Sequence, residues 1–109
     1  MPQPLSSELR ICSNEEMRKL DQIAENEMGI GPVILMENAG RAAAEIMIRE
    51  YPQAGLDREI LVFAGKGNNA GDAFVVARQL MSLGRRVRVF HLVDGKSYKG
   101  ATLENFKIL

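Results

Sequence analysis

The sequence predicts an α/β fold with a parallel sheet, on the strength of three consecutive features. An apolar run at residues 60–64 leads into a glycine-rich turn, a helical pattern that ends at Gly84, and a second apolar run at residues 87–93. A strand, helix and strand at this spacing form one right-handed βαβ unit, in which the two strands are parallel. Because the first run is uniformly apolar, we expect its strand to be covered on both faces.

Two helices are predicted before this unit. Residues 13–16 (SNEE) have the form of a capping box, and an apolar stripe at helical spacing follows as far as Gly29. The second helix is predicted over residues 32–50, because Pro32 suits a first helical turn and Tyr51-Pro52 ends the pattern. Gly40 interrupts this helix at a cost of about 1 kcal/mol relative to alanine. We therefore expect another backbone close to Gly40.

The βαβ unit itself is predicted as a strand over residues 59–64, a helix over 71–83 and a strand over 87–93, and a further helix begins near residue 99. Two strands make a poor isolated sheet, because sheets usually need more strands to protect their edges. We therefore expect residues 1–109 to be the N-terminal part of a single, larger doubly wound domain.

Composition excludes several classes of function. Fourteen basic residues balance fourteen acidic ones, so no net field favours binding to nucleic acid or to a membrane. No apolar run approaches the roughly 20 residues that span a bilayer. Cys12 is the single cysteine, which predicts no disulfide framework and suits a cytoplasmic protein. His91, the single histidine, is interpreted as a packed or surface residue.

The glycine-rich turn (residues 65–72, GKGNNAGD) has three interpretations. The first is a dinucleotide fingerprint, although the spacing of Gly65, Gly67 and Gly71 is GxGxxxG, with the third glycine one residue late. Asp72 also argues against simple phosphate binding, because a carboxylate in a first helical turn would compete with the phosphate for the positive end of the helix dipole.

The second interpretation is a site for hydroxyls, amides and a monovalent cation. Asn68 and Asn69 offer amide groups, Asp72 accepts from hydroxyls, and the turn exposes main-chain carbonyls, which are the oxygen ligands that hard cations prefer. The third interpretation is a purely structural turn, since asparagine and glycine tolerate positive φ and aspartate caps helices. The combination of paired asparagines, three glycines and an acid between a strand and a helix favours a functional site.

Three separated motifs resemble those of the NAD(P)H-hydrate epimerase family, the YjeF N-terminal domain. Residues 65–72 resemble its GxGNNGGDG signature, residues 35–41 (LMENAGR) match its LMENAGR helix, and residues 16–21 (EMRKLD) are similar to its opening helix. The resemblance implies a Rossmann-like αβα sandwich, usually a homodimer. It also implies an isomerase of nicotinamide nucleotide repair, which interconverts the R and S epimers of hydrated NADH and NADPH (NADHX and NADPHX).

By this resemblance Asn68, Asn69, Ala70, Gly71 and Asp72 contact the substrate, and Asn69 also ligates a potassium ion. No catalytic residue is assigned.

Two positions depart from the family pattern, because Ala70 and Ala73 replace glycines. Alanine is compatible with position 70 only if that residue keeps negative φ. The family's second half carries a DAxxGTG-like loop and further ligands, so we expect residues 1–109 alone to turn over poorly.

Two other functions stay open at this point. Some relatives of the fold are non-catalytic dimerisation or binding modules, and the turn also suits a conventional nucleotide-binding half-domain. The retained asparagine pair and aspartate favour the enzyme. Bacterial relatives are often fused to an ATP- or ADP-dependent dehydratase, which makes such a domain a candidate fused or separate partner.

Overall fold

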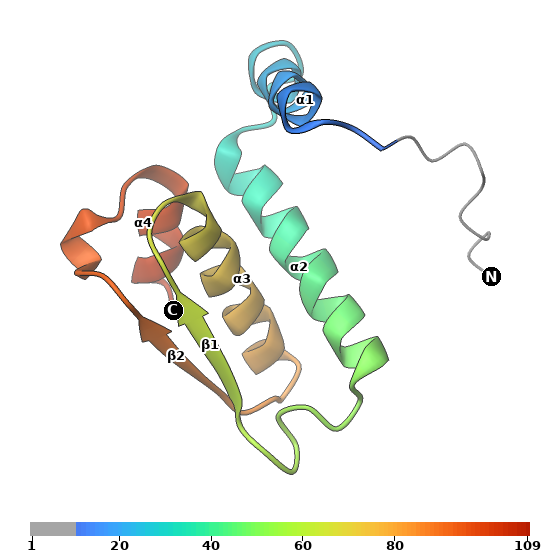
Figure 1. Cartoon of the computed structure of the whole chain (residues 1–109), viewed down its shortest axis with the longest axis vertical. Helices are drawn as coiled ribbons and strands as arrows, with labels where there is room; N and C mark the ends of the chain where they lie inside the picture. The colour runs from blue at the N-terminus through green and yellow to red at the C-terminus, as the bar shows by residue number, and fades with distance from the viewer. Residues whose placement is uncertain (1–10) are drawn as a thin grey trace. The chain divides into compact units, whose positions relative to one another are not determined.

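The computed structural model describes residues 11–109, which fall into two compact units divided after Gly31 (Figure 1). The first unit contains α1 (Asn14–Asn26). Its predicted capping box is confirmed: the Glu16 N–H donates to Ser13 Oγ at 3.1 Å, and the Ser13 N–H donates to Glu16 Oε1 at 3.2 Å. These reciprocal bonds satisfy two donors that would otherwise be unpaired at the start of the helix.

The second unit contains the predicted βαβ arrangement. Its elements are α2 (Pro32–Glu50), β1 (Ile60–Ala64), α3 (Asn68–Ser82), β2 (Val87–His91), the short 3₁₀ helix η1 (Gly95–Ser97) and α4 (Gly100–Lys107). The two strands are parallel, with Ile60 paired to Val87 and Ala64 paired to His91. The α/β class and the parallel sheet are therefore confirmed, and the carboxyl ends of both strands lie at the same edge.

Helix α3 is the centre of this unit, with α2 on one side and the sheet on the other (Figure 1). Its side chains Phe74, Val75 and Leu80 are completely buried. The predicted close approach at Gly40 is confirmed, because a Cβ there would lie 2.3 Å from Val75 Cγ1. Glycine is required at this position because any side chain would push α2 away from α3.

Three aromatic rings fix the C-terminal segment against α3. Phe74 meets Tyr98 edge-on with ring centroids 5.2 Å apart, and Phe106 lies 5.4 Å from Phe74 and 5.1 Å from Tyr98. Tilted and edge-on pairs at these distances are the geometry that aromatic rings prefer. This cluster holds Tyr98 and α4 against α3.

The expectation that β1 is covered on both faces is wrong for the residues that the structure describes. Helix α3 covers one face, whereas on the other face Leu61 is 52% exposed and Phe63 is 62% exposed, with Phe63 stacked on Phe90 at 5.3 Å. The apolar side chains of a strand indicate which of its faces can be buried. They do not indicate which helix or strand covers each face. Within residues 11–109, no helix is both long and apolar enough to span a membrane.

Candidate functional site

The glycine loop (residues 65–67) leaves β1 at the carboxyl edge of the sheet and leads directly into α3. Gly67 is the residue before the helix and has φ +78°, a backbone conformation that favours glycine. The helix then begins at Asn68, whereas the sequence predicted a start at Gly71. Asn68 and Asn69 therefore occupy the first turn of α3, so the site is built from a helix start as well as a loop.

The two asparagines are exposed, and one of them borders a hollow. This hollow of about 260 Å³ lies between the start of α3 and the segment that leads into α4, and it is lined by Gly67, Asn68, Ser97, Tyr98, Lys99 and Thr102. Asn69 is not among these lining residues. Amide, hydroxyl and ammonium groups thus face the hollow, and such groups bind polar ligands.

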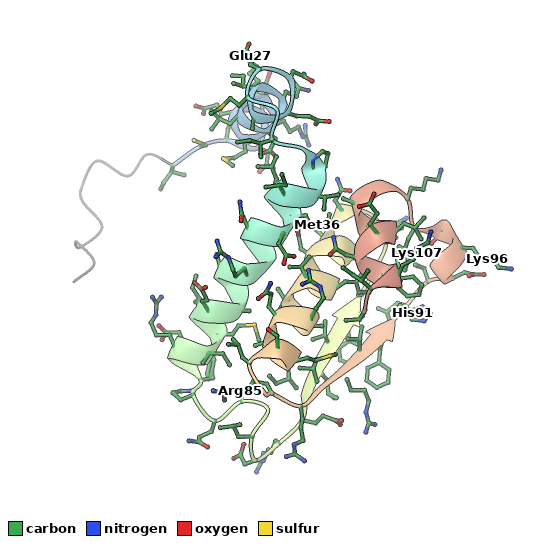
Figure 2. The ribbon with its side chains drawn as sticks, turned by 180° about the vertical axis from the view of Figure 1, so that it is seen from behind. Glu27, Met36, Arg85, His91, Lys96 and Lys107 are labelled. Carbon is green, nitrogen blue, oxygen red and sulfur yellow. The ribbon has the colours of Figure 1, made fainter. Side chains whose placement is uncertain are left out.

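Ala70 and Gly71 lie beneath the asparagines and are buried. No described residue other than glycine has positive φ, so Ala70 meets the condition under which it replaces the family's glycine without strain. A Cβ at Gly71 would lie 2.5 Å from Met36 Cε and 2.7 Å from Thr102 Oγ1. Gly71 therefore allows α2 and α4 to pack closely against the start of α3 (Figure 2 labels Met36 on α2).

Asp72 is half-buried and lies beyond the first turn of α3, not within it as the sequence predicted. Its carboxylate has no hydrogen-bond or ion-pair partner among residues 11–109. Burial raises the pKa of the Asp72 carboxyl above its usual range, because the charged form loses solvation. Asp72 is not among the residues that line the hollow. Perturbed pKa values are more frequent at functional sites than elsewhere, which favours a functional role for Asp72.

Two hydroxyl groups that sequence analysis missed hold the glycine loop. Tyr98 Oη donates to the Gly65 carbonyl at 3.1 Å, and Thr102 Oγ1 donates to the Gly67 carbonyl at 3.3 Å. Nothing in the local sequence signals these bonds, because both hydroxyls lie more than 30 residues further along the chain. Only the packing of α4 against α3 brings them to the loop.

A second polar cluster joins α2, α3 and α4. Arg78 forms an ion pair with Glu37, Gln79 Nε2 donates to Glu37 Oε1 at 2.8 Å, and Arg78 Nη2 donates to Asn105 Oδ1 at 3.3 Å. The hydrogen bond from Arg78 holds the pKa of Glu37 below its usual range, against the opposing effect of burial. This cluster gives the glutamate of the LMENAGR motif a structural role, whereas Asn38 beside it is exposed.

His91 lies at the end of β2 (Figure 2). Its Nδ1 is 2.8 Å from the Val93 carbonyl, and its ring meets Phe106 edge-on at 5.4 Å. The interpretation of His91 as a packed or surface residue is confirmed, since the residue is exposed and also packs against a ring.

The donor set at the loop suits a hard monovalent cation better than a transition metal. Among residues 11–109 no group of three or more histidine, cysteine, aspartate or glutamate side chains is placed to hold a metal ion. Four oxygen-bearing groups at or near the loop accept no hydrogen bond within the described part of the chain: the Asn68 and Asn69 amides, the Asp72 carboxylate and the Lys66 carbonyl. Hard cations bind oxygen ligands of these kinds.

The chain is similar to a family described as YjeF-related protein N-terminus, whose model matches residues 32–109. It is 42% identical to a bifunctional NAD(P)H-hydrate repair enzyme of Moorella thermoacetica, over 85% of the chain and 18% of the relative. It is 34% identical to an NAD(P)H-hydrate epimerase of Elusimicrobium minutum, over 91% of the chain and 45% of that protein.

An NAD(P)H-hydrate epimerase of Rhodopirellula baltica is 35% identical over 86% of the chain and 37% of the relative. The chain thus spans less than half the length of each of these three proteins.

Proposed function

Because the chain belongs to the YjeF-related protein N-terminus family, we propose that the protein is an NAD(P)H-hydrate epimerase that interconverts the R and S forms of NADHX and NADPHX. The observation that carries this proposal is the run from Asn68 to Asp72 at the carboxyl edge of a parallel sheet, where ligands of open α/β folds bind. Its relatives are named for activity on the same hydrated nucleotides. We assign residues 1–31 to the same domain as the matched residues 32–109.

The reaction follows from the chemistry of the hydrate. The carbon that inverts bears a hydroxyl and the ring nitrogen, so the nitrogen lone pair can expel water and leave a planar cation. Water then adds to either face, which exchanges the two epimers. An enzyme accelerates these steps by positioning a proton donor and acceptor and by stabilising the charge that develops.

The residues at the start of α3 have separate roles in this proposal. The side-chain amides of Asn68 and Asn69 donate to and accept from substrate oxygens, and Asn69 also ligates potassium. Asp72 accepts a hydrogen bond from a substrate hydroxyl, and burial raises the pKa of its carboxyl above the usual range. By the resemblance we also assign Ala70 and Gly71 to the substrate site, and both residues are buried beside the exposed asparagines.

A potassium ion held at this loop would supply a fixed positive charge for substrate oxygens. The Asn69 amide oxygen and the Lys66 carbonyl are the groups we assign to it. We further propose that the protein acts in the cytoplasm, as a homodimer, with an ADP- or ATP-dependent dehydratase as a fused domain or separate partner. The word bifunctional in the names of several relatives supports the last point.

Epimerisation of purified hydrated NADPH tests the proposal. The S epimer is incubated with the protein, and the R epimer is followed by chromatography in potassium chloride and in choline chloride. Because residues 1–109 alone are expected to turn over poorly, we expect slow formation of the R epimer, above the rate in buffer and faster in potassium. A rate no greater than that in buffer would refute the proposed activity and favour a non-catalytic binding module.

Asparagine variants provide a matched control. Asn68 and Asn14 are each the first residue of a helix and are both exposed, but Asn14 belongs to α1. We expect Asn68→Ala to lower kcat/KM about tenfold, which corresponds to about 1.4 kcal/mol of transition-state binding. Asn14→Ala should leave kcat/KM unchanged. Equal effects of the two substitutions would contradict the assignment of Asn68.

A further inference from the structure

We propose that Tyr98 and Thr102 are positioning residues, which set the direction of the loop carbonyls and so determine which oxygens are presented to substrate and cation. This inference rests on the proposed function, because it concerns the same site. Neither residue belongs to the motif at residues 65–72, since Tyr98 lies just before α4 and Thr102 lies in its first turn.

The two hydroxyls donate hydrogen bonds to the loop carbonyls on either side of Lys66. Tyr98 Oη donates to the Gly65 carbonyl at 3.1 Å, and Thr102 Oγ1 donates to the Gly67 carbonyl at 3.3 Å. Tyr98 is 4% exposed and Thr102 is 3% exposed. A hydroxyl shielded from water is costly unless it is hydrogen-bonded, so both bonds are strongly favoured over an open arrangement.

The bonds leave a defined set of oxygens free. Because Gly65 and Gly67 direct their carbonyls to the hydroxyls, the carbonyl of Lys66 is the one loop carbonyl without a donor among residues 11–109. It is adjacent in sequence to the φ +78° turn at Gly67 that precedes the asparagine pair. The Gly67 carbonyl also accepts from the Ala70 N–H at 3.2 Å, so Thr102 adds a second donor there. The carbonyls of Gly65 and Gly67 are thus occupied by donors, whereas that of Lys66 is available to a cation.

Packing explains the ring of Tyr98 but not its hydroxyl. The ring lies 5.2 Å from Phe74 and 5.1 Å from Phe106, contacts that phenylalanine at position 98 would preserve. The Thr102 hydroxyl lies close to α3, since its Oγ1 would be only 2.7 Å from a Cβ at Gly71. The absence of a side chain at Gly71 is what admits the hydroxyl to the loop. The loop, α3 and α4 therefore pack closely together at this point.

Three variants test the role. Tyr98→Phe and Thr102→Val each remove one hydroxyl with little change in shape, and Thr102→Ser restores the hydroxyl at that position. The control is Ser82→Ala, because Ser82 Oγ also donates to a carbonyl, that of Gln79 at 2.7 Å, but at the far end of α3. All four proteins and the wild type are compared for thermal unfolding, epimerisation kinetics and the potassium concentration that gives half-maximal rate.

We expect Tyr98→Phe and Thr102→Val each to raise KM and the half-saturating potassium concentration about fivefold, the equivalent of one ordinary hydrogen bond. Thr102→Ser should return both values to those of the wild type. Ser82→Ala should lower the unfolding temperature slightly and leave both values unchanged. If Tyr98→Phe and Thr102→Val behave like Ser82→Ala, the hydroxyls are structural only and the inference is overturned.

A spectroscopic measurement separates this inference from the proposed function. The backbone amide resonances of residues 65–69 are recorded by NMR in the ligand-free proteins. We expect them to shift in Tyr98→Phe and Thr102→Val and to stay in place in Ser82→Ala. Unchanged resonances in the first two variants would overturn the positioning role even in an active epimerase. An inactive wild type with shifted resonances would refute the epimerase while supporting the role of the hydroxyls in fixing the loop.

Discussion

The contact between α2 and α3 at Gly40 gives the sharpest test of the fold. In Gly40→Ala the new Cβ would lie 2.3 Å from Val75 Cγ1 and 2.5 Å from Val75 Cβ, whereas ordinary contact begins at 3.4 Å. The helices must therefore separate by about 1 Å, the difference between 3.4 and 2.3 Å. A change of rotamer cannot relieve the clash, because Val75 Cβ is attached directly to the α3 backbone and the side chain is completely buried.

Two opposing effects set the size of the change. Overpacking of a well-packed core lowers the free energy of unfolding by about 1–3 kcal/mol. Alanine in place of glycine inside a helix raises it by about 1 kcal/mol. The packing effect is the larger, so we expect Gly40→Ala to lower the free energy of unfolding by about 1 kcal/mol and at most about 2 kcal/mol.

Urea unfolding of a double-mutant cycle measures the contact. Val75→Ala alone should cost about 2 kcal/mol, because it leaves a small cavity. In the double variant the new alanine at 40 occupies part of that cavity, so the combined loss should fall short of additivity by about 1 kcal/mol. Gly31→Ala is the control, since no atom lies within 4 Å of its Cβ position. Additive losses, or a Gly40→Ala protein more stable than the wild type, would refute the reasoning.

The remaining predictions concern two carboxylates and one alanine. Since the pKa of Glu37 is lowered in the folded protein, its bond to Arg78 stabilises the fold above the unfolded-state pKa and is lost as pH falls through the folded-state pKa. Glu37→Gln should thus cost about 1 kcal/mol in urea unfolding at pH 7 and much less at pH 3. The pKa of Asp72 is raised, so its destabilising charge is present at neutral pH and disappears on acidification. Asp72→Asn should therefore raise the unfolding temperature at pH 7 but not at pH 3, while lowering kcat/KM. Ala70→Gly should lower the free energy of unfolding by about 1 kcal/mol, because position 70 is helical and needs no glycine.

Each of these three predictions has a result that would contradict it. A Glu37→Gln protein whose stability deficit is the same at pH 3 and pH 7 would show that the charge on Glu37 is immaterial. An Asp72→Asn protein less stable than the wild type at pH 7 would show that the carboxylate has a favourable partner. A more stable Ala70→Gly protein would imply strain at position 70.

The regular elements could be predicted because their signals are local. The capping box at Ser13, the proline at the start of α2 and the apolar strands each depend on a few neighbouring residues, and the structure confirms them. Even the close approach at Gly40 follows from a local anomaly, a glycine inside a helix. The sequence predicts that α3 starts at Gly71, because the asparagines and glycines before it are typical of a turn, whereas the helix starts at Asn68. In the structure Gly71 is there for packing against Met36 and Thr102.

The supports of the site could not be predicted, because they depend on contacts between distant segments. Tyr98 and Thr102 reach the loop only once α4 has packed on α3, and no pattern in residues 95–107 indicates this. The exposed face of β1 could not be predicted either. The apolar composition of a strand indicates that its faces can be buried, but not which element covers each face. The substrate and potassium assignments for residues 68–72 stay predictions, based on the resemblance and on the position of these residues at the carboxyl edge of the sheet, where Asn68 borders the hollow.

Equilibrium binding of hydrated and intact NADPH tests the central claim most directly. The ligand-free protein is titrated by calorimetry with each nucleotide, in potassium chloride and in choline chloride at equal ionic strength. We predict that the hydrated form binds more tightly and that potassium strengthens its binding. Equal affinity for intact NADPH, with no effect of potassium, would contradict the claim and identify the site as a conventional dinucleotide-binding turn.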